Sequence, residues 1–263
     1  MVGTRVTGTL RRLLLLLWPL SLPAFHGAES LAKQFRDPPR DYSMFPLWSW
    51  NGTLTREKLT WQIDQMVEQG VYGAFMHTRA GLNESATPYF SDGFWEGVRA
   101  SVEHAAKVGF QAWIYDEDRW PSGAAGGRTL RANPERFTAT GLEHESRVIE
   151  GPARVPVSFA GAKFVTAARL TDGVRIDPAT LVDLSGLREW NAPPGRWHVC
   201  ILRPRNAPYP LPNYLNPDAV REFLNNTHEQ YAARFGMHFG KTIPGVFFDE
   251  IGNIPLAWDP LLA

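Results

Sequence analysis

FQAWIYDEDRWPSG, residues 110–123, is the stretch of sequence that decides the fold. It begins as a short apolar run and ends in carboxylates, aromatic residues and turn residues. An apolar run without polar alternation is typical of a strand that is buried on both faces of a parallel sheet. Apolar runs followed by polar residues also occur at 45–52, 71–79 and 243–250, so we expect four strands of this kind.

Helical patterns separate these strands. Thr55 and Ser91 are good N-cap residues, and apolar residues then recur at helical spacing until Gly70 and Gly109 end the two helices. An Asn-Pro pair opens a third helical pattern over residues 216–231. Strands that alternate with helices at this spacing predict βαβ units and the α/β class.

The pattern changes between residues 141 and 203. Short runs rich in Val, Thr and Leu, at 163–170, 180–184 and 196–202, are separated by glycine and proline. Such runs favour antiparallel strands. We therefore predict a small inserted antiparallel β module.

The N-terminus resembles an export signal. Arg5, Arg11 and Arg12 precede an apolar run at 13–22, and small residues follow it. We predict a signal peptide over residues 1–28, no stable membrane insertion after its cleavage, and a periplasmic, outer-envelope or secreted protein. An uncleaved anchor is the alternative interpretation.

Composition narrows the range of partners. Lys and Arg total 27 and Asp and Glu total 27, so the formal net charge is zero. No basic cluster suggests nucleic-acid binding, whereas the 10 tryptophans offer flat faces that pack in cores or stack against sugar rings. The single Cys200 excludes an intrachain disulfide. The sequence leaves the oligomeric state open.

Polar and aromatic residues follow all four predicted strands, at the edge where parallel α/β proteins carry their working residues. The predicted substrate-binding residues are Trp50, Asn51, His77, Arg79, Tyr115, Asp116, Glu117, Asp118, Trp120 and Asp249, and Glu250 is the predicted catalytic residue. Carboxylates beside aromatic residues suit glycoside hydrolysis. We therefore expect these side chains to converge on one sugar site.

The carboxylates have several interpretations. We expect Glu250 to be desolvated beside Asp249, which would raise its pKa and suit a general acid, although capping or ion pairing is the alternative. Asp116, Glu117 and Asp118 suit sugar hydroxyls, hard metal ligands or turn caps. The sequence alone does not assign metal ligands.

Four motifs carry a resemblance to a known family. FPLWSWN at 45–51, GAFMHTRAGL at 73–82, YDEDRWPSG at 115–123 and VFFDE at 246–250 resemble bacterial glycoside hydrolase family 106, the α-L-rhamnosidases. The resemblance implies a (β/α)8 barrel, inverting hydrolysis of terminal α-L-rhamnosides, a calcium ion in the sugar site, and Glu250 as general acid. The family usually continues Asp-Glu-Pro, whereas this chain has Ile251 after the pair.

We expect a partial TIM-type barrel of about four βα units. The predicted organisation is a first barrel part at 29–127, the inserted module at 128–210, and a continuing, truncated barrel at 211–263. On this view the chain is a fragment, and the catalytic base lies beyond residue 263. A non-catalytic carbohydrate-binding remnant and a metal-dependent barrel hydrolase remain alternative functions.

Overall fold

The computed structural model describes residues 28–207, 211–252, 254 and 256–262, and it divides into the units Met1–Tyr42 and Ser43–Ala263. In the first unit, the described residues form the helix α1 (Ala28–Arg36) and the 3-10 turn η1 (Arg40–Tyr42). Except for Ala28, the predicted signal segment lies outside the described residues. Among the helices that are described, none has the length and apolar character needed to cross a membrane.

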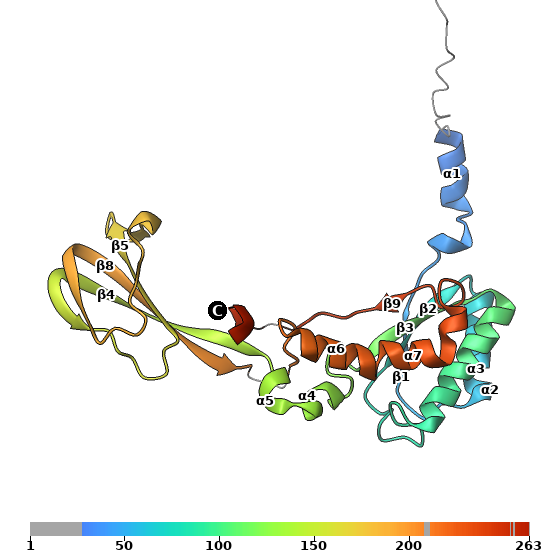
Figure 1. Cartoon of the computed structure of the whole chain (residues 1–263). Helices are drawn as coiled ribbons and strands as arrows, with labels where there is room; N and C mark the ends of the chain where they lie inside the picture. The colour runs from blue at the N-terminus through green and yellow to red at the C-terminus, as the bar shows by residue number, and fades with distance from the viewer. Residues whose placement is uncertain (1–27, 208–210, 253, 255, 263) are drawn as a thin grey trace, which may run out of the picture. The chain divides into compact units, whose positions relative to one another are not determined.

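The second unit contains a four-stranded parallel sheet in the order β1-β2-β3-β9 (Figure 1). Its strands are β1 (Leu47–Trp50), β2 (Gly73–Thr78), β3 (Gln111–Asp118) and β9 (Val246–Phe247). All three neighbouring pairs run parallel, so their carboxyl ends lie at the same edge. The α/β class with a parallel sheet is confirmed, while a barrel stays a prediction.

Two capped helices connect the first three strands. They are α2 (Arg56–Glu68) and α3 (Asp92–Val108). The Ser91 hydroxyl accepts the backbone N–H of Phe94 at 3.2 Å, and Gly109 ends α3 in the left-handed conformation that glycine tolerates. The caps expected from the sequence therefore bound these helices.

The helices cover one face of the sheet with a closely packed core. Ile63 of α2 and Phe94 of α3 are completely buried against Met76 of β2. The Trp50 ring meets Phe94 edge-on, with 5.9 Å between ring centroids. Burial of these apolar side chains is the main force that holds the helices on the sheet.

The helix expected over 216–231 is instead two helices, α6 (Pro217–Asn226) and α7 (His228–Phe235), so this prediction was wrong. Thr227 separates them because its backbone is not helical, and its hydroxyl donates to the Phe223 carbonyl at 2.7 Å. The following strand is also shorter than expected, since Pro244 has no N–H to give to a ladder. A 3-10 turn, η3 (Gly236–His238), follows α7.

The remaining strands form a six-stranded antiparallel sheet in the order β10-β4-β8-β5-β6, with β7 paired to β5 (Figure 1). They are β4 (Thr140–Pro156), β5 (Phe164–Thr171), β6 (Arg175–Ile176), β7 (Val182–Asp183), β8 (Glu189–Asn206) and β10 (Ala257–Trp258). Short helical pieces accompany them: α4 (Arg128–Ala132), α5 (Pro134–Phe137), η2 (Pro178–Thr180) and η4 (Pro260–Leu262). The predicted antiparallel strands are present, and β10 joins them from the segment after β9.

Replacement of Phe94 tests the packing of α3 on the sheet. We expect Phe94→Ala to lower the free energy of unfolding by about 3–5 kcal/mol, because it leaves a cavity between Trp50 and the helix. Urea unfolding measures this loss. Glu96→Ala, at an exposed position of the same helix, should stay within about 0.5 kcal/mol of the parent. A loss of that size or less for Phe94→Ala would contradict the packing described.

Candidate functional site

The carboxyl edge of the parallel sheet brings residues from β2, β3 and the segment after β9 together. The ring centroids of His77 and Tyr115 lie 3.9 Å apart, and the Tyr115 hydroxyl donates to Asp249 Oδ2 at 2.6 Å. Burial, and then the hydrogen bond to Asp249, raise the pKa of Tyr115 well above its ordinary value. Tyr115 therefore stays protonated, and its single hydrogen lies within reach of both Asp249 Oδ2 and the Arg119 carbonyl.

Ser122 links the end of β3 to the segment after β9. The backbone N–H of Asp249 donates to Ser122 Oγ at 2.9 Å, and the Ser122 hydroxyl donates to Asp116 Oδ1 at 2.5 Å. The residue lies in the predicted acidic motif but was not among the predicted site residues. Its role depends on a contact between distant segments, which the motif alone does not reveal.

Asp116 is a fully buried carboxyl group whose second oxygen faces a histidine. Asp116 Oδ2 has no hydrogen-bond partner among the described residues and lies 3.6 Å from His228 Nε2. Desolvation is the main cause that raises the pKa of Asp116 to about 7, and the nearby Glu117 adds to it against the Ser122 hydrogen bond. Asp116 is thus placed to exchange a proton near neutral pH.

The tautomer of His228 follows from its other neighbour. Its Nδ1 lies 2.9 Å from Thr227 Oγ1, and the Thr227 hydrogen is already given to the Phe223 carbonyl. His228 Nδ1 must then be the donor, which leaves the Nε2 lone pair toward Asp116 when the ring is neutral. Burial lowers the pKa of His228, so the neutral ring is favoured. Sequence reasoning missed His228 because nothing in a helical pattern marks such a contact.

Glu117 holds the loop that follows β3. Its Oε1 accepts the backbone N–H groups of Asp118 at 2.8 Å and Gly126 at 2.6 Å, and its Oε2 accepts that of Ala125 at 2.7 Å. Burial raises the pKa of Glu117, and these N–H groups oppose the rise. Glu117 therefore fixes the loop, and its oxygens are not presented to a substrate.

The acidic trio does not form a shared ligand set. Asp116 bonds Ser122, Glu117 bonds backbone N–H groups, and Asp118 Oδ2 accepts the Asn83 amide at 2.6 Å. The part of the chain that the structure describes contains no group of three or more His, Cys, Asp or Glu side chains placed to hold a metal ion. These residues do not fit a calcium site, which stays an expectation from the resemblance.

Trp120 and Glu250 form the exposed part of the site. The Trp120 side chain is 58% exposed, and its Nε1 donates to Glu250 Oε1 at 2.5 Å. The Glu250 backbone N–H in turn donates to Asp249 Oδ1 at 2.8 Å. Glu250 is exposed, so the expectation that it is desolvated was wrong. The strand before it ends early, and the carboxyl group extends into solvent.

Three predicted residues take no part in this network of hydrogen bonds and ring contacts. Trp50 is 2% exposed and packs in the helix-side core, so its ring does not reach the strand ends. Arg79 and Asn51 are exposed, and the Arg79 backbone N–H donates to the Trp50 carbonyl at 2.9 Å. We refer to His77, Tyr115, Trp120, Asp249 and Glu250 as the strand-end site.

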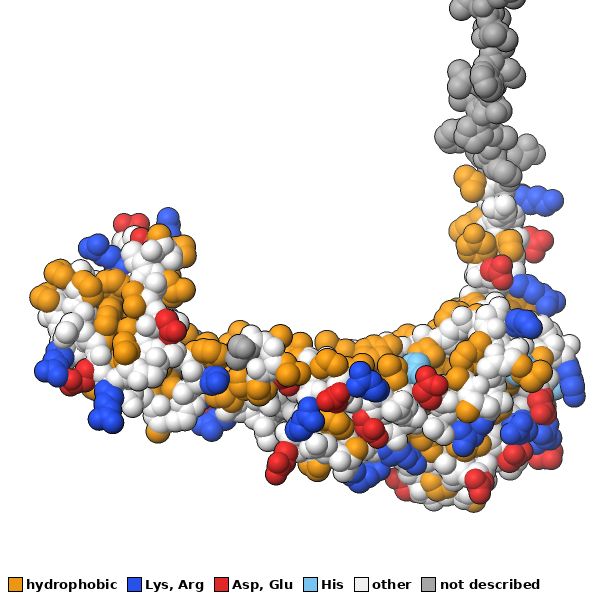
Figure 2. All heavy atoms as spheres, viewed as in Figure 1, with side chains coloured by type: hydrophobic (Ala, Val, Ile, Leu, Met, Phe, Trp, Pro, Cys, Tyr) orange, Lys and Arg blue, Asp and Glu red, His pale blue; other side chains and the backbone are white. Residues whose placement is uncertain are grey.

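The visible face over the helices carries no large patch of one sign of charge (Figure 2). Figure 2 shows acidic and basic side chains intermixed on the visible face over the helices. This mixed pattern agrees with the equal numbers of acidic and basic residues in the sequence. A charged substrate would therefore gain little from long-range steering toward this face.

The buried Asp116 gives a pH dependence of stability. Its folded-state pKa of about 7 exceeds the unfolded value of about 3.9, so between these values the folded state binds more protons. The free energy of unfolding contributed by this group should fall as pH rises through that window. Asp116→Asn should remove this slope, which urea unfolding at pH 5 and pH 8 measures.

Two variants control this measurement. Asp172→Asn, at an exposed position, should keep the parental slope. His228→Gln removes a second titrating group whose effect has the opposite sign. Because the pKa of His228 is lowered in the folded state, its contribution to the free energy of unfolding falls as pH drops below about 6.5. Equal slopes in the parent and in Asp116→Asn would contradict the assignment.

Comparisons with known proteins show a likeness of fold. No protein-family model matches the chain, and no curated protein matches it in sequence. The chain is similar in structure to the rhamnosidase from Novosphingobium sp. PP1Y, with a TM-score of 0.50 and 13% sequence identity. The match covers 88% of this chain and 40% of that chain, so this chain spans less than half of that rhamnosidase. The fold is rhamnosidase-like.

Proposed function

We propose that this chain supplies part of the catalytic barrel of an exported glycoside hydrolase of the α-L-rhamnosidase type, acting on terminal sugars with inversion. The observation that carries the proposal is the exposed Trp120–Glu250 pair at the strand ends. An aromatic face beside a carboxyl group is the combination that binds a sugar ring and protonates its leaving oxygen. The rhamnosidase-like fold and the family 106 motifs support the same activity.

In this proposal Glu250 is the general acid. The Trp120 N–H occupies Oε1, which leaves Oε2 to carry the proton to the glycosidic oxygen. Asp249 is held beside Glu250 by the Tyr115 hydroxyl and by the hydrogen bond from its own backbone N–H to Ser122. The base must lie about 6.5–9.5 Å from the acid, on the other side of the sugar ring.

The other predicted residues have supporting roles. Asn51, His77, Arg79 and Asp118 would bind sugar hydroxyl groups. Both ring nitrogens of the buried His77 lack a hydrogen-bond partner among the described residues, so a sugar would have to displace the neighbouring side chains to reach them. Burial, and then the neighbouring Arg79, lower the pKa of His77, which favours a neutral ring that both donates and accepts.

Substitution of Glu250 tests the chemistry. In the intact protein, Glu250→Gln should lower kcat on α-L-rhamnosides by about 10²–10⁴-fold, because the amide cannot give a proton to the leaving group. The loss should be larger for a methyl rhamnoside than for a nitrophenyl rhamnoside, whose leaving group needs little protonation. Glu96→Gln, an exposed carboxylate on α3, should leave kcat unchanged.

The outcomes separate the alternative functions. Parental turnover of the methyl rhamnoside by Glu250→Gln would remove Glu250 from the acid role. If the parent binds the rhamnoside but hydrolyses none of it, a non-catalytic carbohydrate-binding function replaces the enzyme. Loss of activity with a chelator that zinc reverses and calcium does not would favour a metal-dependent hydrolase.

Substitutions of Trp120 test the contact with the sugar. Trp120→Ala should raise KM by about tenfold, which corresponds to roughly 1.4 kcal/mol of lost stacking. Trp120→Phe retains a ring but loses the N–H to Glu250, so it should lower kcat more than it raises KM. Steady-state kinetics on the nitrophenyl rhamnoside measure both parameters. Parental KM in Trp120→Ala would show that the ring does not contact the sugar.

A further inference from the structure

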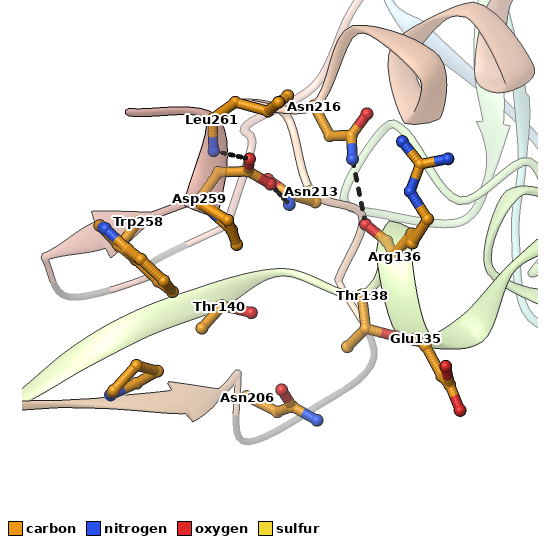
Figure 3. A pocket seen from close by; sticks show the side chains of 12 residues that line it. Glu135, Arg136, Thr138, Thr140, Asn206, Asn213, Asn216, Trp258, Asp259 and Leu261 are labelled. Atoms are coloured by element: carbon orange, nitrogen blue, oxygen red, sulfur yellow. Dashed lines mark hydrogen bonds between the residues drawn. The ribbon is translucent and has the colours of Figure 1, made fainter. Parts of the chain in front are cut away.

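A cavity of about 340 Å³ lies within the unit Ser43–Ala263, outside the strand-end site (Figure 3). Residues of α5, the first residue of β4, the end of β8, and β10 line it. Its volume falls at the lower end of the range of about 300–1,000 Å³ that is usual for small-molecule sites. The cavity is therefore large enough for a small ligand.

Bonded and buried polar residues form one wall of this cavity. Asn213 Nδ2 donates to Asp259 Oδ2 at 2.5 Å, and the Leu261 N–H donates to Asp259 Oδ1 at 2.8 Å. Asn216 Nδ2 donates to the Arg136 carbonyl at 3.3 Å. Asn213, Asn216 and Asp259 are each at most 5% exposed. These bonds fix the wall before a ligand arrives, which lowers the entropy lost on binding.

The remaining lining offers unused polar groups beside an aromatic ring. The side chains of Glu135, Thr140, Asn206 and Trp258 line the cavity. Within the described residues, none of these four side chains has a hydrogen bond or an ion pair. Figure 3 shows the Trp258 ring, Thr140 and Asn206 around the same space. The cavity thus presents an indole, a hydroxyl, an amide and a carboxylate.

These groups discriminate between classes of ligand. An anion would need a cation, but the Arg136 guanidinium is already paired with Asp218 at 3.0 Å. A metal ion would need several oxygens, but both Asp259 oxygens accept hydrogen bonds and Glu135 is exposed. A wholly apolar ligand would leave the polar groups without partners. A neutral polyhydroxylated ring satisfies the amide, hydroxyl and carboxylate, and its C–H face covers the indole.

We propose that this cavity is an accessory binding site for a neutral saccharide, with Trp258 as the stacking platform and Glu135, Thr140 and Asn206 as hydrogen-bonding partners. The site is separate from the strand-end site and does not depend on its chemistry. Its role is to hold a sugar without cleaving it, since Glu135 is its one unpaired carboxylate and both oxygens of the second, Asp259, already accept hydrogen bonds.

The test follows the indole N–H resonances of the intact protein labelled with ¹⁵N-tryptophan. The Trp258 resonance is the one that disappears in Trp258→Phe. Titration with D-xylose and with L-rhamnose should shift it saturably for at least one of these sugars. Glu135→Ala, at an exposed position, and Asn206→Ala should each weaken the binding by about tenfold, the usual effect of one lost hydrogen bond to a ligand.

Two controls separate this site from the strand-end site. Trp120→Ala and Glu250→Gln should leave the Trp258 titration unchanged, so the proposal can succeed even if the chain hydrolyses no rhamnoside. Inorganic phosphate should produce no shift. The proposal is overturned if neither sugar moves the Trp258 resonance, if phosphate moves it equally, or if Trp120→Ala abolishes the effect.

Discussion

The Ser122 hydroxyl is the contact on which the arrangement of the site depends. It accepts the N–H of Asp249 and donates to the buried Asp116, and so joins segments separated by 127 residues in the chain. One hydroxyl serves both strand ends because it can donate and accept at once. The Tyr115–Asp249 and Trp120–Glu250 hydrogen bonds cross the same junction. Without Ser122, only these two side-chain hydrogen bonds would join Asp249 and Glu250 to the end of β3.

Neighbouring carboxylates at this sheet edge have different environments and different roles. Asp116 and Glu117 are buried and hold the structure, one through Ser122 and the other through loop N–H groups. Glu250 is exposed beside an exposed indole. The difference in burial thus distinguishes the structural carboxylates, Asp116 and Glu117, from Glu250, whose carboxyl group is accessible to a substrate. Asp116, which contacts His228, has a pKa raised to about 7 by its burial in the sheet.

The sequence predicted those features that local chemistry determines. Apolar runs and the caps Thr55 and Ser91 located the parallel strands and the helices between them. Features that depend on tertiary contacts were not predictable. An apolar run does not say which face of a strand a residue occupies, so the burial of Trp50 was missed. Helical spacing continues through Thr227, so the break there was missed, and the contact of His228 with Asp116 exists only after α7 packs on the sheet.

The pairing of β10 with β4 has a consequence for how the protein is made. Because Ala257 pairs with Gly141, the antiparallel sheet receives the edge strand β10 only after the ribosome has translated β1, β2, β3 and β9. Until then the first two residues of β4, Thr140 and Gly141, have an open backbone edge, a template for pairing with another chain. The strands of the antiparallel sheet are therefore not contiguous in the sequence. A truncated protein that ends before residue 257 would keep this part of the β4 edge unpaired.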